Sequence, residues 1–388
     1  TGYLIKEAYK KSNINRLNNF IDFEKKFEST EASSENDSIP IINEDEFIDL
    51  RQIGTGTVFG VNLIYHIERE ELYALKKQLM LDNEIEKLRN REIENYTKVQ
   101  HPFIPKLIGI GRKKEYVIIE FINGQTLLNI NEFQLTFSDK ITIFFEMLII
   151  IEYLHRKKFI YRDLKSNNVM IDKNKTVVLI DFDRMITYEE SFNTTTKNFI
   201  HPYCAPEVNE KNFSYEVDIY SLGKVFLFMM NQSLDEFLIS EEPEEIKQII
   251  ALSKEKEPDK RPSIIRIIFV FYIKYHNIIQ INNLLEIYLK NFTEFYKLDE
   301  TEENTSNNNY CSILSFLGYI YGKDNFIEYD INKSIYYYTL AANQNDVKAQ
   351  FQLGYLYEKG DLIPRDMEKS IYYYSLAANQ NDVEAQFN

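Results

Sequence analysis

The feature that most constrains the fold is an internal repeat in the last part of the chain. The segment Lys333–Val347 recurs as Lys369–Val383, at an offset of 36 residues and with a single substitution. A fixed period of this size is typical of a solenoid, in which each helical unit buries its apolar face against the next. We therefore predict an α-solenoid over residues 310–388. A partial further copy at Glu384–Phe387 predicts that the array is truncated there.

Further matches at the same offset strengthen this prediction. Leu317–Tyr319 and Leu353–Tyr355 are 36 residues apart, and their glycines, Gly318 and Gly354, would let packed helices approach closely. The order Leu-Gly-x-x-Tyr, Asp-x-x-Lys, Tyr-x-x-Ala-Ala resembles the Sel-one-like repeats, relatives of the tetratricopeptide repeats. The resemblance implies a scaffold for binding a protein partner. We read the run Tyr336–Tyr338 as part of the core face of a repeat helix.

A different kind of motif lies in the middle of the chain. Tyr161–Asn168 reads Y-R-D-L-K-S-N-N, and Asp181-Phe182-Asp183 begins 13 residues after Asn168, behind a predicted apolar strand at Thr176–Ile180. The two segments resemble the H-R-D-x-x-x-x-N catalytic loop and the D-F-G segment of eukaryotic-type protein kinases. Lys165, two residues after Asp163, is typical of the Ser/Thr kinases.

A glycine-rich turn and a lysine precede these motifs. Gly54-Thr55-Gly56 ends a strand-like run, and Lys76 follows Gly54 by 22 residues. A glycine-rich turn lets backbone N–H groups approach phosphates, although alone it is as easily a hairpin turn. Together with Lys76 it resembles the nucleotide-binding lobe of a protein kinase. On the following charged helix Glu92 is the favoured carboxylate partner of Lys76, and Glu94 is its rival.

The resemblance implies a role for each matching residue. Asp163 would accept the proton of the substrate hydroxyl, Lys165 would contact the γ-phosphate, and Lys76 would bind the α- and β-phosphates, so these three are the expected catalytic residues. Asn168 and Asp181 would hold Mg²⁺. The residues expected to bind the nucleotide are Gly54, Thr55, Gly56, Val61, Ala74, Lys76, Glu92, Glu120, Ile122, Asn168 and Asp181.

The resemblance also implies a fold, which the order of the elements supports. Strands are expected first and helices later, which favours an α+β unit with a small β-sheet lobe carrying one helix and a larger helical lobe. The expected strands are Phe47–Ile53, Val61–Ile67, Leu72–Lys77 and Tyr116–Phe121, and the expected helices include Asp82–Val99 and Ile141–Leu154. Later in the chain, Glu207 of an A-P-E motif and Arg261 would form a buried ion pair.

These motifs divide the chain into four parts. We assign residues 47–275 to the kinase domain, 276–309 to a linker, and 1–46 to a partly disordered N-terminal extension. The implied reaction is transfer of the γ-phosphate of ATP, with Mg²⁺, to Ser or Thr of a protein substrate. Arg162 next to the catalytic aspartate suggests regulation by phosphorylation of Thr194–Thr196 or the nearby Ser191.

Two departures from the family pattern leave an alternative open. Phe59 replaces the third glycine of the phosphate loop, and Asp183 replaces the glycine of D-F-G. Phe59 is expected to weaken ATP binding, whereas Asp183 would either repel the phosphates or add a metal ligand. The alternative to an active kinase is therefore an inactive pseudokinase scaffold that acts as a protein-interaction adaptor.

The net charge and the cysteine count limit which partners and which cellular compartment we expect. The formal net charge of −15 argues against nucleic acid or an anionic membrane as a partner, because phosphate binding requires clustered Lys and Arg. The only cysteines, Cys204 and Cys311, provide neither a disulfide framework nor a zinc site, which favours the reducing cytoplasm. The longest apolar stretches are too short and too charged to span a membrane.

Overall fold

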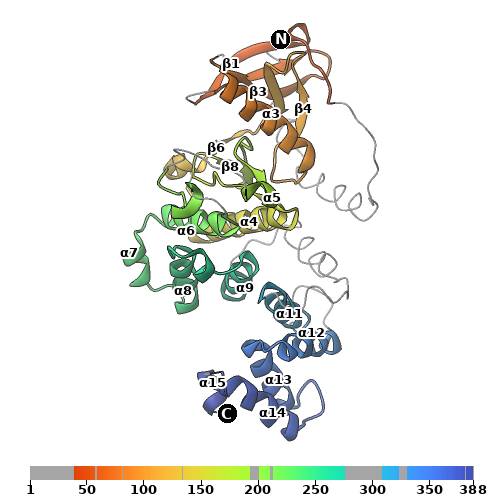
Figure 1. The fold of residues 1–388 in the computed structure, drawn as a ribbon, viewed down its shortest axis with the longest axis vertical. Coiled ribbons are helices and arrows are strands. Elements are labelled where there is room, and N and C mark those ends of the chain that lie inside the picture. The colour runs from red at the N-terminus through yellow and green to blue at the C-terminus, as the bar shows by residue number, and fades with distance from the viewer. Residues whose placement is uncertain are drawn as a thin grey trace. The chain divides into compact units, whose positions relative to one another are not determined.

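The computed structural model describes residues 39–56, 59–80, 82–132, 134–192, 201–209, 213–275, 308–322, 330–380 and 382–387 (Figure 1). The chain forms two compact units. The first contains the described residues up to Ile264, the second contains those from Asn308 onward, and helix α9 (Ile264–Tyr275) is divided between them. No helix among the described residues has the length and apolar character needed to cross a membrane.

The first unit begins with a five-stranded antiparallel sheet in the order β1-β2-β3-β5-β4. Its strands are β1 (Phe47–Thr55), β2 (Phe59–His66), β3 (Glu71–Gln78), β4 (Leu107–Ile110) and β5 (Tyr116–Glu120). One helix, α3 (Asn83–Lys98), accompanies this sheet, and the Asp82 side chain caps it by accepting from the Glu84 N–H at 2.7 Å. This is the small lobe that the sequence predicts.

The chain just before the sheet also belongs to the small lobe, although our sequence boundary placed it in the extension. Ile42 is 1% exposed and packs with Ile64, Tyr73 and Tyr116, whose hydroxyl donates to the Ile42 carbonyl at 2.7 Å. Ile41 pairs with Ile110 in an isolated bridge, next to the edge strand β4. This segment therefore covers part of the edge of the sheet that would otherwise remain unpaired.

The larger lobe is mainly helical. Its central helix α4 (Phe137–Arg156) is buried along most of its length and begins with a capping box between Thr136 and Asp139. The other helices are α5 (Tyr188–Ser191), α6 (Glu216–Met230), α7 (Leu234–Leu238), α8 (Glu244–Ser253) and α9. Short 3-10 helices lie at Glu44–Glu46, Leu127–Glu132, Pro206–Asn209 and Pro258–Lys260.

Two small sheets carry the chemical motifs of this lobe. The sheet of β6 (Gly124–Thr126), β8 (Val169–Asp172) and β9 (Val177–Leu179) leads into the D-F-G-like segment, and β7 (Phe159–Ile160) pairs with β10 (Ile186–Thr187). The catalytic-loop motif connects β7 to β8. The strand predicted at Thr176–Ile180 is confirmed as β9. The other four strands are two to four residues long, which is too short to give a recognisable alternating pattern in the sequence.

The second unit consists of the helices α11 (Asn308–Tyr321), α12 (Ile331–Asn343), α13 (Val347–Lys359), α14 (Met367–Ala378) and α15 (Val383–Phe387). The close approach expected at the glycines is confirmed. A Cβ on Gly318 would lie 2.6 Å from the ring of Tyr338, and one on Gly354 would lie 2.7 Å from the ring of Tyr374. The tyrosine run is only partly core, because Tyr338 is 5% exposed whereas Tyr336 is 52% exposed.

Candidate active site

The lysine of the small lobe bridges two carboxylates. Lys76 Nζ lies 2.8 Å from Glu92 Oε1 and 2.8 Å from Asp181 Oδ1. Burial favours the neutral lysine, but the charges of Asp181 and Glu92 outweigh this effect and hold the pKa of Lys76 well above its ordinary value. Lys76 therefore stays protonated. The rival carboxylate, Glu94, is exposed and pairs with Lys98 instead.

The catalytic-loop motif is held by one buried aspartate of α6. Asp218 is fully buried and accepts the backbone N–H groups of Tyr161 at 2.9 Å and Arg162 at 2.7 Å, while His155 Nε2 lies 2.9 Å away. Arg162 has a φ of 71°, a left-handed conformation that a non-glycine residue adopts at a cost. The hydrogen bonds to Asp218 offset that cost and fix the direction of the loop.

The Asp163 carboxylate is surrounded by donors. Lys165 Nζ lies 2.9 and 2.8 Å from its two oxygens, and Asn168 Nδ2 donates to Oδ2 at 2.9 Å. His201 Nε2 lies 3.1 Å from Oδ1. Burial alone would raise the pKa of Asp163, but the nearby His201 ring and the charge of Lys165 bring it below its ordinary value. Asp163 is therefore an ionised carboxylate whose oxygens are already engaged.

The D-F-G-like segment points its two aspartates toward the catalytic loop. Asp181 has a φ of 69°, and the ring of Phe182 packs against Tyr96 and Tyr161 at centroid distances of 5.1 and 5.5 Å. The Asn95 side chain on α3 donates to the Phe182 carbonyl at 2.7 Å. The segment is therefore clamped between α3 and the catalytic loop. Tyr161, which replaces the family histidine, is fully buried and serves this packing.

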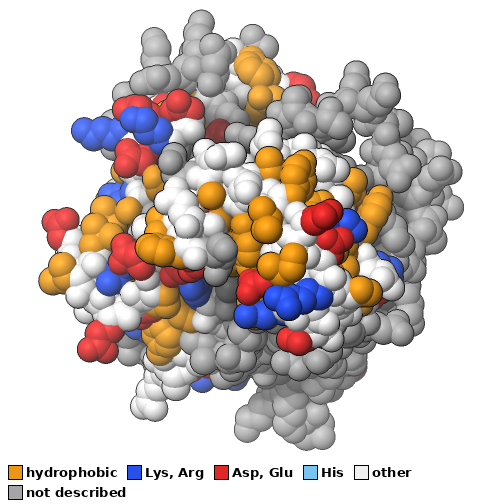
Figure 2. Space-filling view, turned by 90° about the horizontal axis from the view of Figure 1, so that it is seen from below, with side chains coloured by type: hydrophobic (Ala, Val, Ile, Leu, Met, Phe, Trp, Pro, Cys, Tyr) orange, Lys and Arg blue, Asp and Glu red, His pale blue; other side chains and the backbone are white. Residues whose placement is uncertain are grey.

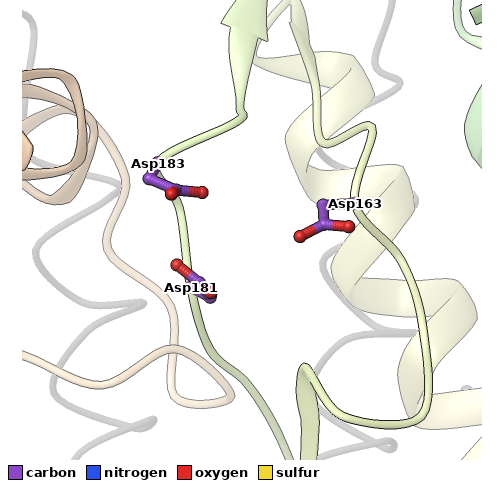
Figure 3. A group of neighbouring side chains, drawn as sticks. All are labelled: Asp163, Asp181 and Asp183. Carbon is purple, nitrogen blue, oxygen red and sulfur yellow. The ribbon is translucent and has the colours of Figure 1, made fainter. Parts of the chain in front are cut away.

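Three carboxylates meet at this point. One oxygen from each of Asp163, Asp181 and Asp183 lies within 4.8 Å of the others, and Figure 3 shows the side chains converging from two separate segments. Asp183 is 7% exposed, and its Oδ1 has no hydrogen-bond partner within the part of the chain that the structure describes. Burial, and then the charge of Asp181, raise the pKa of Asp183 to about 8. Without a bound metal ion, Asp183 is thus largely protonated at neutral pH.

The oxygen atoms at this site suit a hard divalent cation. Asn168 uses its Nδ2 to bind the carbonyl and carboxylate of Asp163, so its side-chain oxygen is the atom available for a metal. Carboxylate and amide oxygens are the protein ligands that Mg²⁺ prefers. Together with the unpartnered oxygen of Asp183, this donor set fits the Mg²⁺ that the family resemblance implies.

The glycine-rich turn brings an unexpected aromatic ring to the lysine. Gly56 donates its N–H to the Phe59 carbonyl at 2.8 Å, and Val61 pairs with Lys76 across β2 and β3. The ring of Phe59 lies 4.7 Å from Lys76 Nζ, within the range of a cation–π contact. Phe59 thus covers the ammonium group that is expected to contact phosphates.

The remaining expected nucleotide residues lie at the end of β1, in the middle of β3, at the end of β5 and just after it. Ala74 pairs with Ile119 across these strands, and Glu120 donates its N–H to the Lys106 carbonyl at 2.9 Å. Ile122 is 7% exposed. Gly54 pairs with Val61, and Thr55 ends β1 on the exposed side of the sheet. The structure therefore places these residues on neighbouring strands and on the segment that links the two lobes.

The supporting ion pair of the large lobe is confirmed. Arg261 Nη2 donates to Glu207 Oε2 at 2.9 Å, and both side chains are buried. The threonines Thr194–Thr196, expected to be phosphorylated, lie outside the described residues. Ser191 is fully buried and donates to the Tyr188 carbonyl at 2.7 Å, so it is not accessible for modification in this conformation.

Two members of the site were missed by sequence reasoning. His201 reaches Asp163 from a segment with no recognisable motif. Phe59 was identified as a departure from the pattern, but its contact with Lys76 was not foreseen. The register of β2 and β3 would have predicted the contact of Phe59 with Lys76. Phe59 pairs with Gln78 and Val61 pairs with Lys76, so Phe59 and Lys76 are diagonal neighbours on one face of the sheet.

Comparison with known proteins agrees with this geometry. The protein kinase domain family matches residues 47–268, more than half of the chain, and the Sel1 repeat family matches residues 314–346 and 347–382. Similar proteins include a probable serine/threonine-protein kinase of Dictyostelium discoideum, 34% identical over 42% of this chain. They also include the cAMP-dependent protein kinase type 3 of Saccharomyces cerevisiae, 31% identical over 48% of this chain.

A third relative is the serine/threonine-protein kinase sgk-1 of Caenorhabditis elegans, 31% identical over 48% of this chain. The matches cover 42%, 48% and 42% of the lengths of these three relatives, so the chain spans less than half of each. The motifs, the bilobal fold and the family match all concern the same residues. The chain therefore belongs to the protein kinase family, with Sel1 repeats following its kinase domain along the sequence.

Proposed function

We propose that this chain is an ATP-dependent protein kinase that phosphorylates Ser or Thr of a protein substrate. The observation that carries the proposal is the pair of 2.8 Å contacts from Lys76 to Glu92 and to Asp181. These contacts connect the helix of the small lobe to the D-F-G-like segment. They hold a protonated lysine where phosphate oxygens can be bound, which is the arrangement that phosphoryl transfer requires.

Each residue has a stated task in the proposed reaction. Gly54 and Gly56 bring the backbone close to the phosphates, and Lys76, oriented by Glu92, binds the α- and β-phosphates. Asp163 orients the acceptor hydroxyl and accepts its proton at Oδ1, because Lys165 contacts both oxygens and moves to the phosphate, whereas Asn168 continues to donate to Oδ2. Since His201 now lies 3.1 Å from Oδ1, the substrate hydroxyl must take the place of the His201 ring.

The proposed metal site consists of Asp181 and Asn168. When bound there, Mg²⁺ would neutralise charge on the phosphates that react. Lys165 would bind the γ-phosphate, for which it must leave Asp163. Adenine would hydrogen-bond to the backbone of the segment from Glu120 to Ile122. The Ser/Thr specificity is supported by Lys165 and by the kinase relatives named above.

The test is transfer of labelled phosphate from ATP, with Mg²⁺, to a generic basic protein and to the chain itself. We expect the wild type to transfer phosphate and Asp163→Asn to lose activity by at least about a hundredfold, because that variant lacks the proton acceptor. Circular dichroism of both proteins checks that they are equally folded. Absence of transfer by a folded wild type, with Mn²⁺ also supplied, would overturn the proposal.

A second candidate function is a pseudokinase scaffold. It is favoured by two contacts: Phe59 covers Lys76, and His201 occupies an oxygen of Asp163. Both contacts would have to break during turnover. Binding of an ATP analogue by a folded chain that never transfers phosphate would support the scaffold, whereas turnover would exclude it.

The repeats are proposed to bind a protein partner. Several of their large apolar side chains are exposed, namely Tyr336, Tyr355, Ile371 and Tyr372. Figure 2 shows hydrophobic side chains gathered between acidic and basic ones on one face of the molecule. Such mixed surfaces are typical of protein interfaces, and the net charge of −15 disfavours nucleic acid. We propose a cytoplasmic location, which fits the free thiol of Cys204.

A further inference from the structure

Asp183 has no task in the reaction proposed above, yet its surroundings are costly for a carboxylate. The side chain is 7% exposed, and its Oδ1 has no hydrogen-bond partner among the described residues. Burying an ionised carboxylate without a partner costs several kcal/mol, so such groups are normally paired or bound to metal. The position therefore holds either a neutral carboxyl group or an ionised one bound to a ligand of positive charge.

The direction of the side chain shows where that ligand would lie. The carboxylates of Asp183, Asp181 and Asp163 converge, with one oxygen from each within 4.8 Å of the others (Figure 3). Two oxygens on opposite sides of a bound ion lie about 4.2 Å apart for Mg²⁺ and about 4.6 to 5.2 Å apart for Ca²⁺. The spacing thus accommodates one divalent cation.

The neighbouring cations leave two oxygens available. Lys76 binds Oδ1 of Asp181, which leaves Oδ2, and Lys165 and His201 occupy the oxygens of Asp163. Asp183 Oδ1 and Asp181 Oδ2 are therefore the expected direct ligands, and Asp163 adds negative charge at the edge. The Asp181 side chain is 33% exposed, so water can complete the coordination.

We propose that Asp183 and Asp181 bind a divalent cation in the absence of nucleotide. The assignment extends the proposed function, because it adds a third ligand, and a second carboxylate, to a metal site expected to contain Asp181 and Asn168. It rests on the proposed function only for its use in phosphoryl transfer. Metal binding itself requires the carboxylates alone, and it would give the chain a preloaded cation when ATP arrives.

The test is a titration of Mn²⁺ into the nucleotide-free full chain, followed by calorimetry and by loss of the electron-paramagnetic-resonance signal of free Mn²⁺. We expect one Mn²⁺ per chain with a dissociation constant on the order of 10⁻⁴ M, as in partly solvated carboxylate sites. Asp183→Asn keeps the size of the side chain and should weaken binding at least about tenfold, the loss expected for one charged ligand. Asp259→Asn, at an exposed aspartate, is the matched control and should bind as the wild type does.

Three results would overturn the inference. They are no binding by the wild type at millimolar Mn²⁺, equal binding by the wild type and Asp183→Asn, and an equal loss in the Asp259→Asn control. If Asp183→Asn folds poorly, Asp183→Gly, which restores the glycine of D-F-G, takes its place. A labelled-ATP assay on the same samples separates the two proposals, because Mn²⁺ binding without turnover would refute only the kinase, and turnover without nucleotide-free binding would refute only this site.

Discussion

The neutral, buried His101 should make the kinase domain sensitive to mild acid. Its ring packs against Phe103 and Tyr153 at centroid distances of 5.2 and 4.9 Å, and its Nδ1 accepts the Phe103 N–H at 3.2 Å. Burial, assisted by the charge of Arg156, lowers the pKa of His101 from 6.5 to about 3. In the unfolded chain the same side chain titrates with a pKa of about 6.5.

The sign and size of the effect follow from this difference. Below a pH of about 6.5 the unfolded chain takes up a proton that the folded chain refuses until a pH of about 3, so stability falls as pH falls across that window. Each pH unit below about 6.5 costs about 1.4 kcal/mol. At a pH of about 5 the free energy of unfolding should therefore have dropped by about 2 kcal/mol because of His101 alone.

The assay is urea unfolding of the wild type and His101→Asn at pH values of about 7.5 and 5, followed by circular dichroism and tyrosine fluorescence. Asparagine can still accept the Phe103 N–H but does not titrate. His101→Asn should be less stable than the wild type at the higher pH, and that deficit should shrink by about 2 kcal/mol at the lower pH. Tyr153→Phe, which alters the same contact without titrating in this range, should show a deficit independent of pH. A deficit of His101→Asn that does not change with pH would refute the reasoning.

Three further predictions concern other contacts. Phe59→Leu removes the ring from Lys76 but keeps an apolar side chain, so the affinity for an ATP analogue, measured by calorimetry, should rise about 2- to 30-fold, the equivalent of a cation–π contact of about 0.5 to 2 kcal/mol; weaker binding would contradict this. Glu207→Gln leaves the charge of Arg261 buried without its partner and should lower the free energy of unfolding of the kinase domain by about 3 to 5 kcal/mol in urea; a loss below about 1 kcal/mol would show that the pair is not needed. Gly354→Ala places a Cβ 2.7 Å from the Tyr374 ring and should destabilise the repeats by about 1 to 3 kcal/mol, seen as an earlier repeat transition on heating; an unchanged transition would mean that the ring moves away freely.

Elements with long patterns were predictable from the sequence, and most short ones were not; the exception is β9, which the continuous apolar run at Thr176–Ile180 predicted. The strands Phe47–Thr55, Phe59–His66 and Glu71–Gln78 and the helix α4 contain enough alternating or continuous apolar residues to be recognised. Strand β4 escaped because it is four residues long and contains Gly109. The burial of Ile42 also escaped, because a short apolar pair after a polar segment carries no period.

The residues of the candidate site also fall into a group that the sequence predicted and a group that it did not. Lys76, Glu92, Asp163, Asn168 and Asp181 were found because fixed spacings in the chain mark them, and their roles remain predictions until the variants are tested. The contact of His201 with Asp163 joins distant segments, for which the local sequence has no signal. The inference that Glu92 rather than Glu94 faces Lys76 agrees with the ion pair, because the helix directs one of the two inward and the other to solvent.

The repeated contacts in the second unit have an evolutionary consequence. Ser334 donates to the Gly318 carbonyl and Ser370 to the Gly354 carbonyl, while Tyr321 stacks on Tyr337 as Tyr357 stacks on Tyr373. Because successive repeats make the same contacts, duplication of the gene segment that encodes 36 residues would add a helix pair that already fits its neighbours. The array can thus lengthen by one whole repeat at a time, without a new kind of contact between its helices.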